Sequence, residues 1–110
     1  MNWSQAISSI ATSLGALQAS STAVELSQQH PTEARIVTDA EAVQACSQLL
    51  DDHRVLVEPA CGAALALLYS ERHRKALERF DSLVVIVCGG GGVNWEIMQQ
   101  WRREYLQKSC

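Results

Sequence analysis

The spacing of hydrophobic and polar positions along the chain predicts helices that alternate with short extended segments. The clearest helix lies between Thr38 and Asp52, where Thr38 and Glu41 have the spacing of a capping box. The apolar residues that follow mark one helical face: Val43, Cys46, Leu49 and Leu50. We therefore expect this helix to pack one side against a core.

The region before this helix has weaker patterns. Residues 7–16 are rich in small and hydroxyl side chains, which is typical of a loop. Thr22 and Glu25 repeat the capping-box spacing, so a second helix is expected over residues 21–30, and Pro31 is placed to end it. Such a start does not resemble the opening of a compact fold.

The second half of the chain begins with a helix, expected over residues 60–69, that is apolar on nearly all sides and should be buried. Pro59 suits its first turn, and we interpret Glu58 as a capping carboxylate rather than a catalytic acid. The charged residues 70–79 are expected to continue as an exposed helix. Asn94 is suited to cap a last helix. The apolar face of that helix carries Trp95, Met98, Trp101 and Tyr105.

Three short apolar segments are candidate β-strands: residues 34–38, 55–57 and 82–88. The last is a continuous β-branched run without alternation, which indicates a strand buried on both faces of a parallel sheet. Helices between such strands predict α/β architecture. Two or three strands make a poor sheet, so we expect marginal stability and exposed apolar edges without further neighbours.

The end of the last candidate strand is the position best suited to chemistry. Ligands of open α/β sheets bind beyond the carboxyl ends of strands, and there Cys88 is followed by four glycines, residues 89–92. Backbone N–H groups before a helix can bind an anion, but the run lacks the lysine of a P-loop and the spacing of a dinucleotide-binding loop. A flexible turn after a buried thiol explains the same residues equally well.

Charge and length limit the classes of function. The 110 residues carry a net charge of −3 and suffice for one domain. The cationic cluster over residues 72–79 is interrupted by Leu77 and Glu78, which indicates a solvated helix face and no nucleic-acid partner. No apolar run is long enough to span a bilayer, and residues 1–10 lack the features of a signal peptide, so no membrane partner is expected.

The titratable side chains give no catalytic pattern. The cysteines are scattered: Cys46, Cys61, Cys88 and Cys110. They are typical of free thiols in a reducing compartment, so a cytoplasmic location is expected, and no zinc-ligand spacing is present. We expect His30, His53 and His73 to be exposed. Lys75 and Lys108 lie in charged surroundings, unlike a desolvated amine that forms a Schiff base.

Three segments carry a resemblance to a known family: residues 9–16 (SIATSLGA), 57–66 (VEPACGAALA) and 82–90 (SLVVIVCGG). In this order and spacing they resemble the C-terminal third of L-serine dehydratase, a pyridoxal-phosphate enzyme of the tryptophan-synthase-β-like fold. The resemblance departs at both ends and at Gly91 and Gly92, where the family usually carries Asn or Ser. It implies a partial three-layer α/β/α sheet, with residues 1–110 as an incomplete, C-terminal part of the large domain and no second domain.

The resemblance implies a role for Cys88 and the backbone of Gly89 beside it. The residue that matches Cys88 hydrogen-bonds the pyridine nitrogen of the cofactor in this family, and in animal and fungal serine dehydratases it is a cysteine. A thiol does not hold a proton on that nitrogen as a carboxylate would. The ring is then a milder electron sink, which suits loss of a β-hydroxyl.

The resemblance assigns the first segment to the other side of the cofactor. Ser13 and Gly15 would line one face of the ring, with Ser13 standing where the family commonly has a smaller residue. The carbonyl groups of Leu14 and Ala16 would bind a monovalent cation such as potassium. No catalytic residue is assigned, because the family's S-x-K motif with the Schiff-base lysine and its phosphate-binding loop do not occur in this sequence.

The resemblance therefore implies an L-serine (or L-threonine) dehydratase that converts serine to pyruvate and ammonia. Its implied partners are pyridoxal phosphate, a small amino-acid substrate and, for the full-length enzyme, a second copy in a homodimer. We expect this chain alone to be inactive. The alternative from another class is a non-catalytic α/β module that binds a small anion or a partner subunit through its glycines, and a regulatory domain is a weaker third option.

Overall fold

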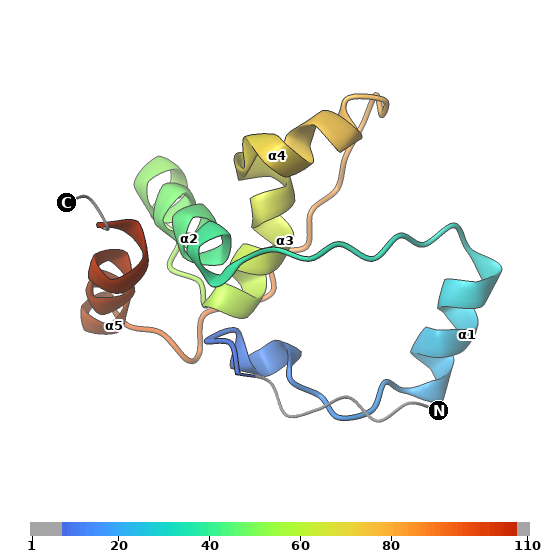
Figure 1. The fold of residues 1–110 in the computed structure, drawn as a ribbon, viewed down its shortest axis with the longest axis horizontal. Coiled ribbons are helices and arrows are strands. Elements are labelled where there is room, and N and C mark those ends of the chain that lie inside the picture. Colours follow the sequence, from blue (N-terminus) through green and yellow to red (C-terminus); the bar gives the residue numbers. More distant parts are fainter. Residues whose placement is uncertain (1–7, 108–110) are drawn as a thin grey trace.

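The computed structural model describes residues 8–107, which form a helical body with extended chain on one side of it (Figure 1). In order, the elements are η1 (Thr12–Leu14), α1 (Ser21–Gln29), α2 (Asp39–His53), α3 (Pro59–Tyr69), α4 (Glu71–Arg74), η2 (Lys75–Leu77), α5 (Trp95–Trp101) and η3 (Arg102–Leu106). The helical body, as we use the term, consists of α2, α3, α5 and η3. Helix α1 lies apart from it, at the far end of a long extended connection.

The predicted boundaries of the body helices are confirmed. At the start of α2, the Thr38 Oγ accepts a hydrogen bond from the Glu41 backbone N–H at 3.1 Å, and the Glu41 carboxylate accepts one from the Thr38 N–H at 2.8 Å. Pro59 occupies the first turn of α3, and the Asn94 side chain accepts from the Ile97 N–H at the start of α5. Local capping chemistry therefore sets where these helices begin.

The cap of α1 differs from the prediction. The helix forms over Ser21–Gln29, close to the expected range, but its N-cap is Ser20, whose Oγ accepts from the Ala23 N–H at 3.1 Å. The capping box between Thr22 and Glu25 was therefore wrong, because both residues already lie within the helix. No residue of α1 is buried.

The core lies where α2, α3 and α5 meet. Its fully buried side chains include Val43 and Cys46 of α2, Cys61 of α3, Met98 of α5, and Val57 in the connection before α3. Helices α2 and α3 approach so closely at Gly62 that an added Cβ would lie 2.2 Å from the Ala42 carbonyl oxygen. Glycine at this position is therefore a packing requirement, since any side chain would push the two helices apart.

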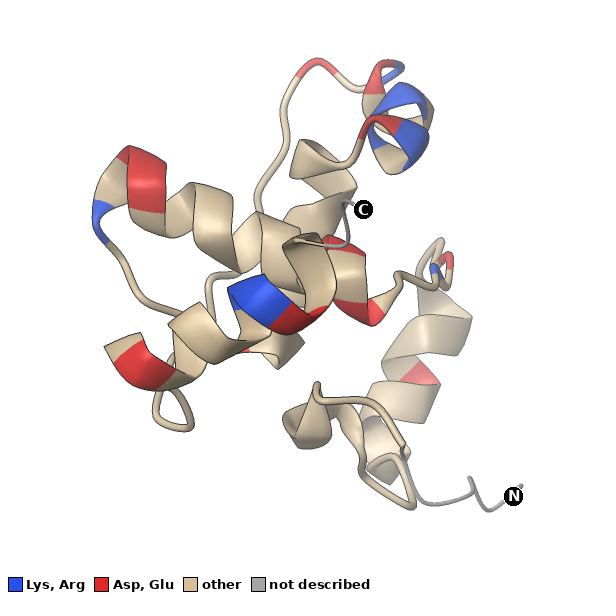
Figure 2. Cartoon of the chain, turned by 60° about the vertical axis from the view of Figure 1, so that its left-hand side comes forward, with Lys and Arg blue, Asp and Glu red and all other residues tan. Residues whose placement is uncertain are grey.

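The charged residues 70–79 do not form one exposed helix. They divide into the short α4 and η2, and several of the Lys and Arg residues of the chain lie in this part of it (Figure 2). The prediction that His73 is exposed was wrong, because its side chain is only 5% exposed. Within residues 8–107 no helix is long and apolar enough to cross a membrane.

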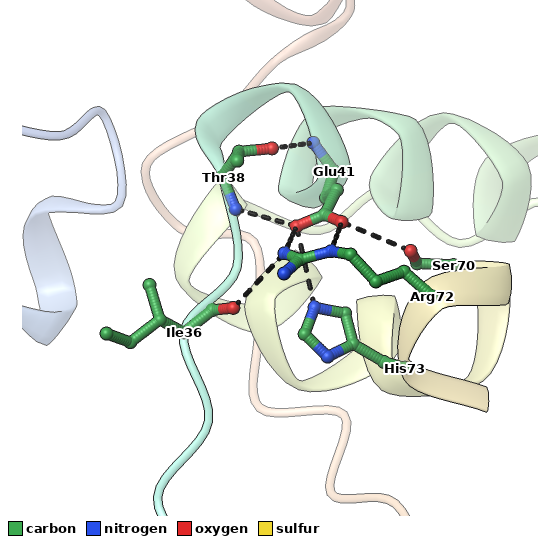
Figure 3. A network of polar contacts seen from close by, with 6 residues as sticks. All are labelled: Ile36, Thr38, Glu41, Ser70, Arg72 and His73. Carbon is green, nitrogen blue, oxygen red and sulfur yellow. Dashed lines mark hydrogen bonds and ion pairs between the residues drawn. The ribbon is translucent and has the colours of Figure 1, made fainter. Parts of the chain in front are cut away.

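A polar network explains why α4 folds back onto the start of α2 (Figure 3). The guanidinium of Arg72 donates to both carboxylate oxygens of Glu41, at 2.9 and 2.8 Å, and the Ser70 hydroxyl donates to the same carboxylate at 3.2 Å. The Nε2 of His73 lies 3.6 Å from it. The Arg72 hydrogen bonds hold the pKa of Glu41 at about 2, below its ordinary 4.5.

The three predicted strands do not form within residues 8–107, so this part of the expectation was wrong for the chain as it stands. Residues 34–38, 55–57 and 82–88 run as extended chain without a hydrogen-bonded ladder. Several apolar side chains in these segments are largely exposed: Val84 to 89%, Ile36 to 85% and Ile86 to 70%. A strand exists only through hydrogen bonds to a neighbouring strand, and the described residues supply none.

Candidate functional site

The end of the extended segment, residues 82–88, is held against the first turn of α3. The Cys88 backbone N–H donates to the Cys61 Sγ at 3.3 Å, and the Gly89 carbonyl accepts from the Glu58 N–H at 3.1 Å. At Gly90 an added Cβ would lie 2.2 Å from the Leu56 carbonyl oxygen, so this approach requires glycine. The glycine loop, residues 89–92, therefore lies on the N-terminal end of α3.

Glu58 connects this loop to the start of the chain. Its carboxylate accepts a hydrogen bond from the Ser13 hydroxyl at 2.6 Å and one from the Gly92 backbone N–H at 3.0 Å. The Ser13 hydrogen bond, and then that of Gly92, hold the pKa of Glu58 below its ordinary value, so the side chain is ionised at neutral pH. The structure thus joins the first family-like segment to the glycine loop through one carboxylate.

The interpretation of Glu58 as a capping carboxylate was wrong in one respect. The residue occupies the N-cap position of α3, but its side chain makes no capping hydrogen bond. Ser, Thr, Asp and Asn are the usual N-cap residues, because a longer side chain such as that of Glu reaches past the first backbone N–H groups. Ser13, Glu58 and Gly92 lie far apart in the sequence, so no local signal could have identified this bridge.

A cavity of about 560 Å³ lies between the start of the chain, α2 and α3. Cys88 and Leu14 both line it, whereas Ser13, Gly15, Ala16 and Gly89 are not part of its wall. The wall is mostly apolar, with Arg35 and Asp39 among its charged residues. Of the six predicted site residues, two therefore share this cavity, and Ser13 joins the site only through Glu58.

Cys88 presents a neutral thiol to this cavity. Partial loss of water, together with the neighbouring Cys61, raises the pKa of Cys88 above its ordinary 9, so the thiol stays protonated at neutral pH. A neutral S–H can donate or accept a weak hydrogen bond. This chemistry fits a heteroaromatic ring nitrogen, which needs a hydrogen-bonding partner but not a fixed charge.

The described residues do not favour an anion site at the glycine loop, a metal site or a lysine in the cavity. The Gly92 N–H already binds a carboxylate of the chain itself, and the negative charge of Glu58 disfavours a second anion at the glycine loop. Among residues 8–107 no cluster of three or more His, Cys, Asp and Glu side chains could hold a metal ion. Of the two lysines, Lys75 is exposed on η2 and does not line the cavity, and Lys108 lies outside the described residues.

Comparison with known proteins points in one direction. The profile of a family described as "Pyridoxal-phosphate dependent enzyme" matches residues 2–89. A human protein named "Serine dehydratase-like" is 46% identical over 99 residues, covering 84% of this chain and 30% of that protein. Human "L-serine dehydratase/L-threonine deaminase" is 45% identical over 94 residues, covering 80% of this chain and 29% of that protein.

A solved structure agrees with these sequence matches. The fungal L-serine ammonia-lyase from Rhizomucor miehei superimposes with a TM-score of 0.79 at 36% identity, covering 89% of this chain and 32% of that chain. The chain therefore spans about a third of the length of the relatives it matches.

Proposed function

Because this chain belongs to the family of pyridoxal-phosphate-dependent enzymes, we propose that it is the part of an L-serine or L-threonine dehydratase that contacts the cofactor ring. The observation that carries the proposal is the neutral thiol of Cys88 on the wall of the 560 Å³ cavity. The names of its relatives support the substrate class, a small β-hydroxy amino acid. The products would be pyruvate and ammonia when the substrate is serine.

Cys88 has the chemistry that such a reaction needs. When bound, pyridoxal phosphate supplies an electron sink for loss of the α-proton and the β-hydroxyl of an amino acid. Cys88 would give the ring nitrogen a neutral hydrogen-bonding partner, with the Gly89 backbone beside it. A carboxylate at this position would instead keep that nitrogen protonated and strengthen the sink, which favours side reactions over quick elimination.

The segment around η1 would form the other side of the ring site. We propose that Ser13 and Gly15 line one face of the ring and that the carbonyl groups of Leu14 and Ala16 bind a monovalent cation such as potassium. The cavity wall shared by Leu14 and Cys88 supports this arrangement, as does the bridge from Ser13 through Glu58 to the glycine loop. Glu58 would then fix the position of the η1 segment relative to the glycine loop.

The exposed apolar residues fit a larger fold. We propose that residues 82–88 join a three-layer α/β/α sheet in the complete enzyme, with residues 1–110 as the C-terminal part of its large domain. The high exposure of Val84 and Ile86 supports this, because both side chains are then covered by neighbouring layers. A homodimer in the cytoplasm is the expected assembly and location of that enzyme.

A chimeric enzyme tests the proposal. This chain replaces the matching segment of human L-serine dehydratase/L-threonine deaminase, and pyruvate formation is measured per bound cofactor. We expect Cys88→Ser to keep most of the activity, since it retains a neutral hydrogen-bonding group. Cys88→Asp should lower the rate by roughly tenfold or more, because it places a charge at the end of a buried strand and changes the protonation of the ring nitrogen.

The controls separate a cofactor contact from a general effect of mutation. Cys110→Ser removes a thiol that we do not place in the site, and it should leave both the activity and the cofactor absorbance unchanged. This chain by itself, mixed with serine and pyridoxal phosphate, should form no pyruvate. Equal activity and equal cofactor absorbance for the Asp and Ser variants of Cys88 would show that this residue does not touch the ring.

A further inference from the structure

Three thiols lie close together where the extended segment meets the helical body. Cys46 in α2 and Cys61 in α3 are fully buried, whereas Cys88 is exposed. The Cys61 Sγ accepts the hydrogen bond from the Cys88 N–H at 3.3 Å, and the Cys46 Sγ donates to the Glu58 carbonyl at 3.4 Å. The cluster thus runs from the core to the surface, with Cys61 between the other two.

We propose that Cys61 and Cys88 form a reversible disulfide when the chain meets a low-molecular-weight disulfide such as oxidised glutathione. This modification site goes beyond the proposed function and rests on the positions and solvent exposure of the thiols. Where the proposed function also holds, the disulfide removes the thiol that would face the ring nitrogen, so it would act as an inhibitory switch.

The geometry favours this pair. The Cα of Cys88 is only about 1.5 Å from the backbone nitrogen that contacts the Cys61 Sγ. Since the Cys61 Sγ lies 3.3 Å from that nitrogen, it is within about 5 Å of the Cys88 Cα, which is within reach of the Cys88 side chain. The extended segment has no ladder of hydrogen bonds to break, since its neighbours Val84 and Ile86 are largely exposed. The chain before Cys88 can thus adjust to bonding geometry, while the hydrogen bond from the Glu58 N–H to the Gly89 carbonyl keeps Cys88 beside Cys61.

Cys46 is the competing partner, and two observations disfavour it. Burial raises the pKa of Cys46 to about 12, so almost none of it is the reactive thiolate at neutral pH. Both Cys46 and Cys61 are closed to solvent, so no oxidant reaches that pair directly. The pKa of Cys88 is also raised, which is why the reaction needs mildly alkaline pH, but Cys88 is the exposed member of the cluster and therefore meets the oxidant first.

The reaction balances as two thiol–disulfide exchanges. The Cys88 thiolate attacks one sulfur of oxidised glutathione, forming a mixed disulfide and expelling one glutathione thiolate. The Cys61 thiolate then attacks the Cys88 sulfur, closing the protein disulfide and expelling the second glutathione thiolate. The two protons lost by the cysteines go to the two glutathione thiolates. The cysteines are oxidised by two electrons, and glutathione disulfide is reduced by two.

Peptide mapping of the full 110-residue chain tests this pairing. In a Cys110→Ser background the native chain is treated with oxidised glutathione at mildly alkaline pH, alkylated and cut with trypsin. The three remaining cysteines then fall on separate peptides, residues 36–54, 55–72 and 80–102. We expect a link between peptides 55–72 and 80–102, loss of two of the three thiols, and full reversal by dithiothreitol.

Matched variants and an unfolded control sharpen the result. Cys61→Ser and Cys88→Ser should each abolish the link, whereas Cys46→Ala should keep it, with far-UV circular dichroism confirming that each variant retains its helices. In concentrated urea the pairing should be a mixture that favours Cys46 with Cys61, because their loop is shorter. Loss of this selectivity on unfolding would show that the fold directs the pairing.

Four outcomes would overturn the proposal. They are a glutathione adduct on Cys88 that Cys61 never displaces, a link to peptide 36–54 in the native chain, links found only between two chains, and the same mixture in native and unfolded samples.

Discussion

The helical body and the two extended arms differ in how far they bury similar apolar residues. Val57, beside α3, is 1% exposed, whereas Val84 in the extended segment is 89% exposed. The first arm is residues 18–38 and the second arm is residues 78–88. The first arm includes α1, which has no buried residue. Hydrophobic character alone therefore does not decide burial, because an apolar side chain is buried only where another element is available to cover it.

The difference follows from the way helices and strands form their backbone hydrogen bonds. A helix forms hydrogen bonds between its own N–H and C=O groups. Capping residues and the packing of one apolar face are therefore enough to stabilise α2 and α3. A strand must find its partners elsewhere in the chain or in another chain. The body helices thus find their hydrogen-bond and packing partners within the described residues. The extended arms need a neighbouring strand that the described residues do not include.

Removal of a core side chain should give the largest effect on stability. Met98→Ala deletes a fully buried side chain between α5 and the other body helices, and we expect it to lower the free energy of unfolding by about 2–5 kcal/mol. Ile86→Ala, in the second arm, should change it by less than about 0.5 kcal/mol. Urea unfolding followed by circular dichroism measures both. Equal losses would mean that the arm is packed in solution.

Glycines provide a second comparison, between the helical body and the glycine loop. Gly62→Ala places a methyl group 2.2 Å from the Ala42 carbonyl oxygen, so we expect a loss of about 1–3 kcal/mol or more. Gly91→Ala meets no atom within 4 Å and should be close to neutral. The same unfolding experiment reports both values. A neutral Gly62→Ala would show that α2 and α3 are further apart than the structure places them.

The ion pair of Glu41 should make the stability of the body depend on pH. The pKa of Glu41 falls from 4.5 to about 2 on folding, so its contribution is complete above pH 4.5 and is lost as the pH falls towards 2. Glu41→Gln keeps the capping-box geometry but removes the charge. Because Arg72 is exposed and partly screened by solvent, we expect a loss of about 1–2 kcal/mol at neutral pH.

The control for this measurement lies in the first arm. Glu25→Gln, on α1, which has no buried residue, should leave the free energy of unfolding at neutral pH unchanged. For Glu41→Gln the difference from the parent chain should shrink steadily between pH 4.5 and pH 2. A difference that stays constant over this range would contradict the ion pair as its source.

Capping residues should give the smallest effect. Thr38→Ala removes the cap of α2 and should cost about 1 kcal/mol of global stability. Ser20→Ala removes the equivalent cap of α1, and it should lower helix content slightly without moving the unfolding midpoint, since α1 buries nothing. Urea midpoints and far-UV circular dichroism distinguish the two responses. A shifted midpoint for Ser20→Ala would place α1 in contact with the body.

Much of the candidate site could be anticipated from the sequence, but its connections could not. Cys88 and the glycines stand out because β-branched residues precede them and Asn94 begins a helix after them. The bridge from Ser13 through Glu58 to Gly92 spans most of the chain, so no local pattern indicates it. The burial of His73 likewise depends on α4 folding back onto Glu41 through Arg72.

The sequence by itself determined the helices of the body, because capping boxes, an N-terminal proline and helical periodicity act over only a few residues. It also determined the resemblance to pyridoxal-phosphate enzymes through strings such as VEPACGAALA. Tertiary structure alone decided which thiols meet, which carboxylate joins the glycine loop to η1, and that residues 82–88 form no strand ladder. These depend on partners far apart in sequence, whose positions follow only from packing.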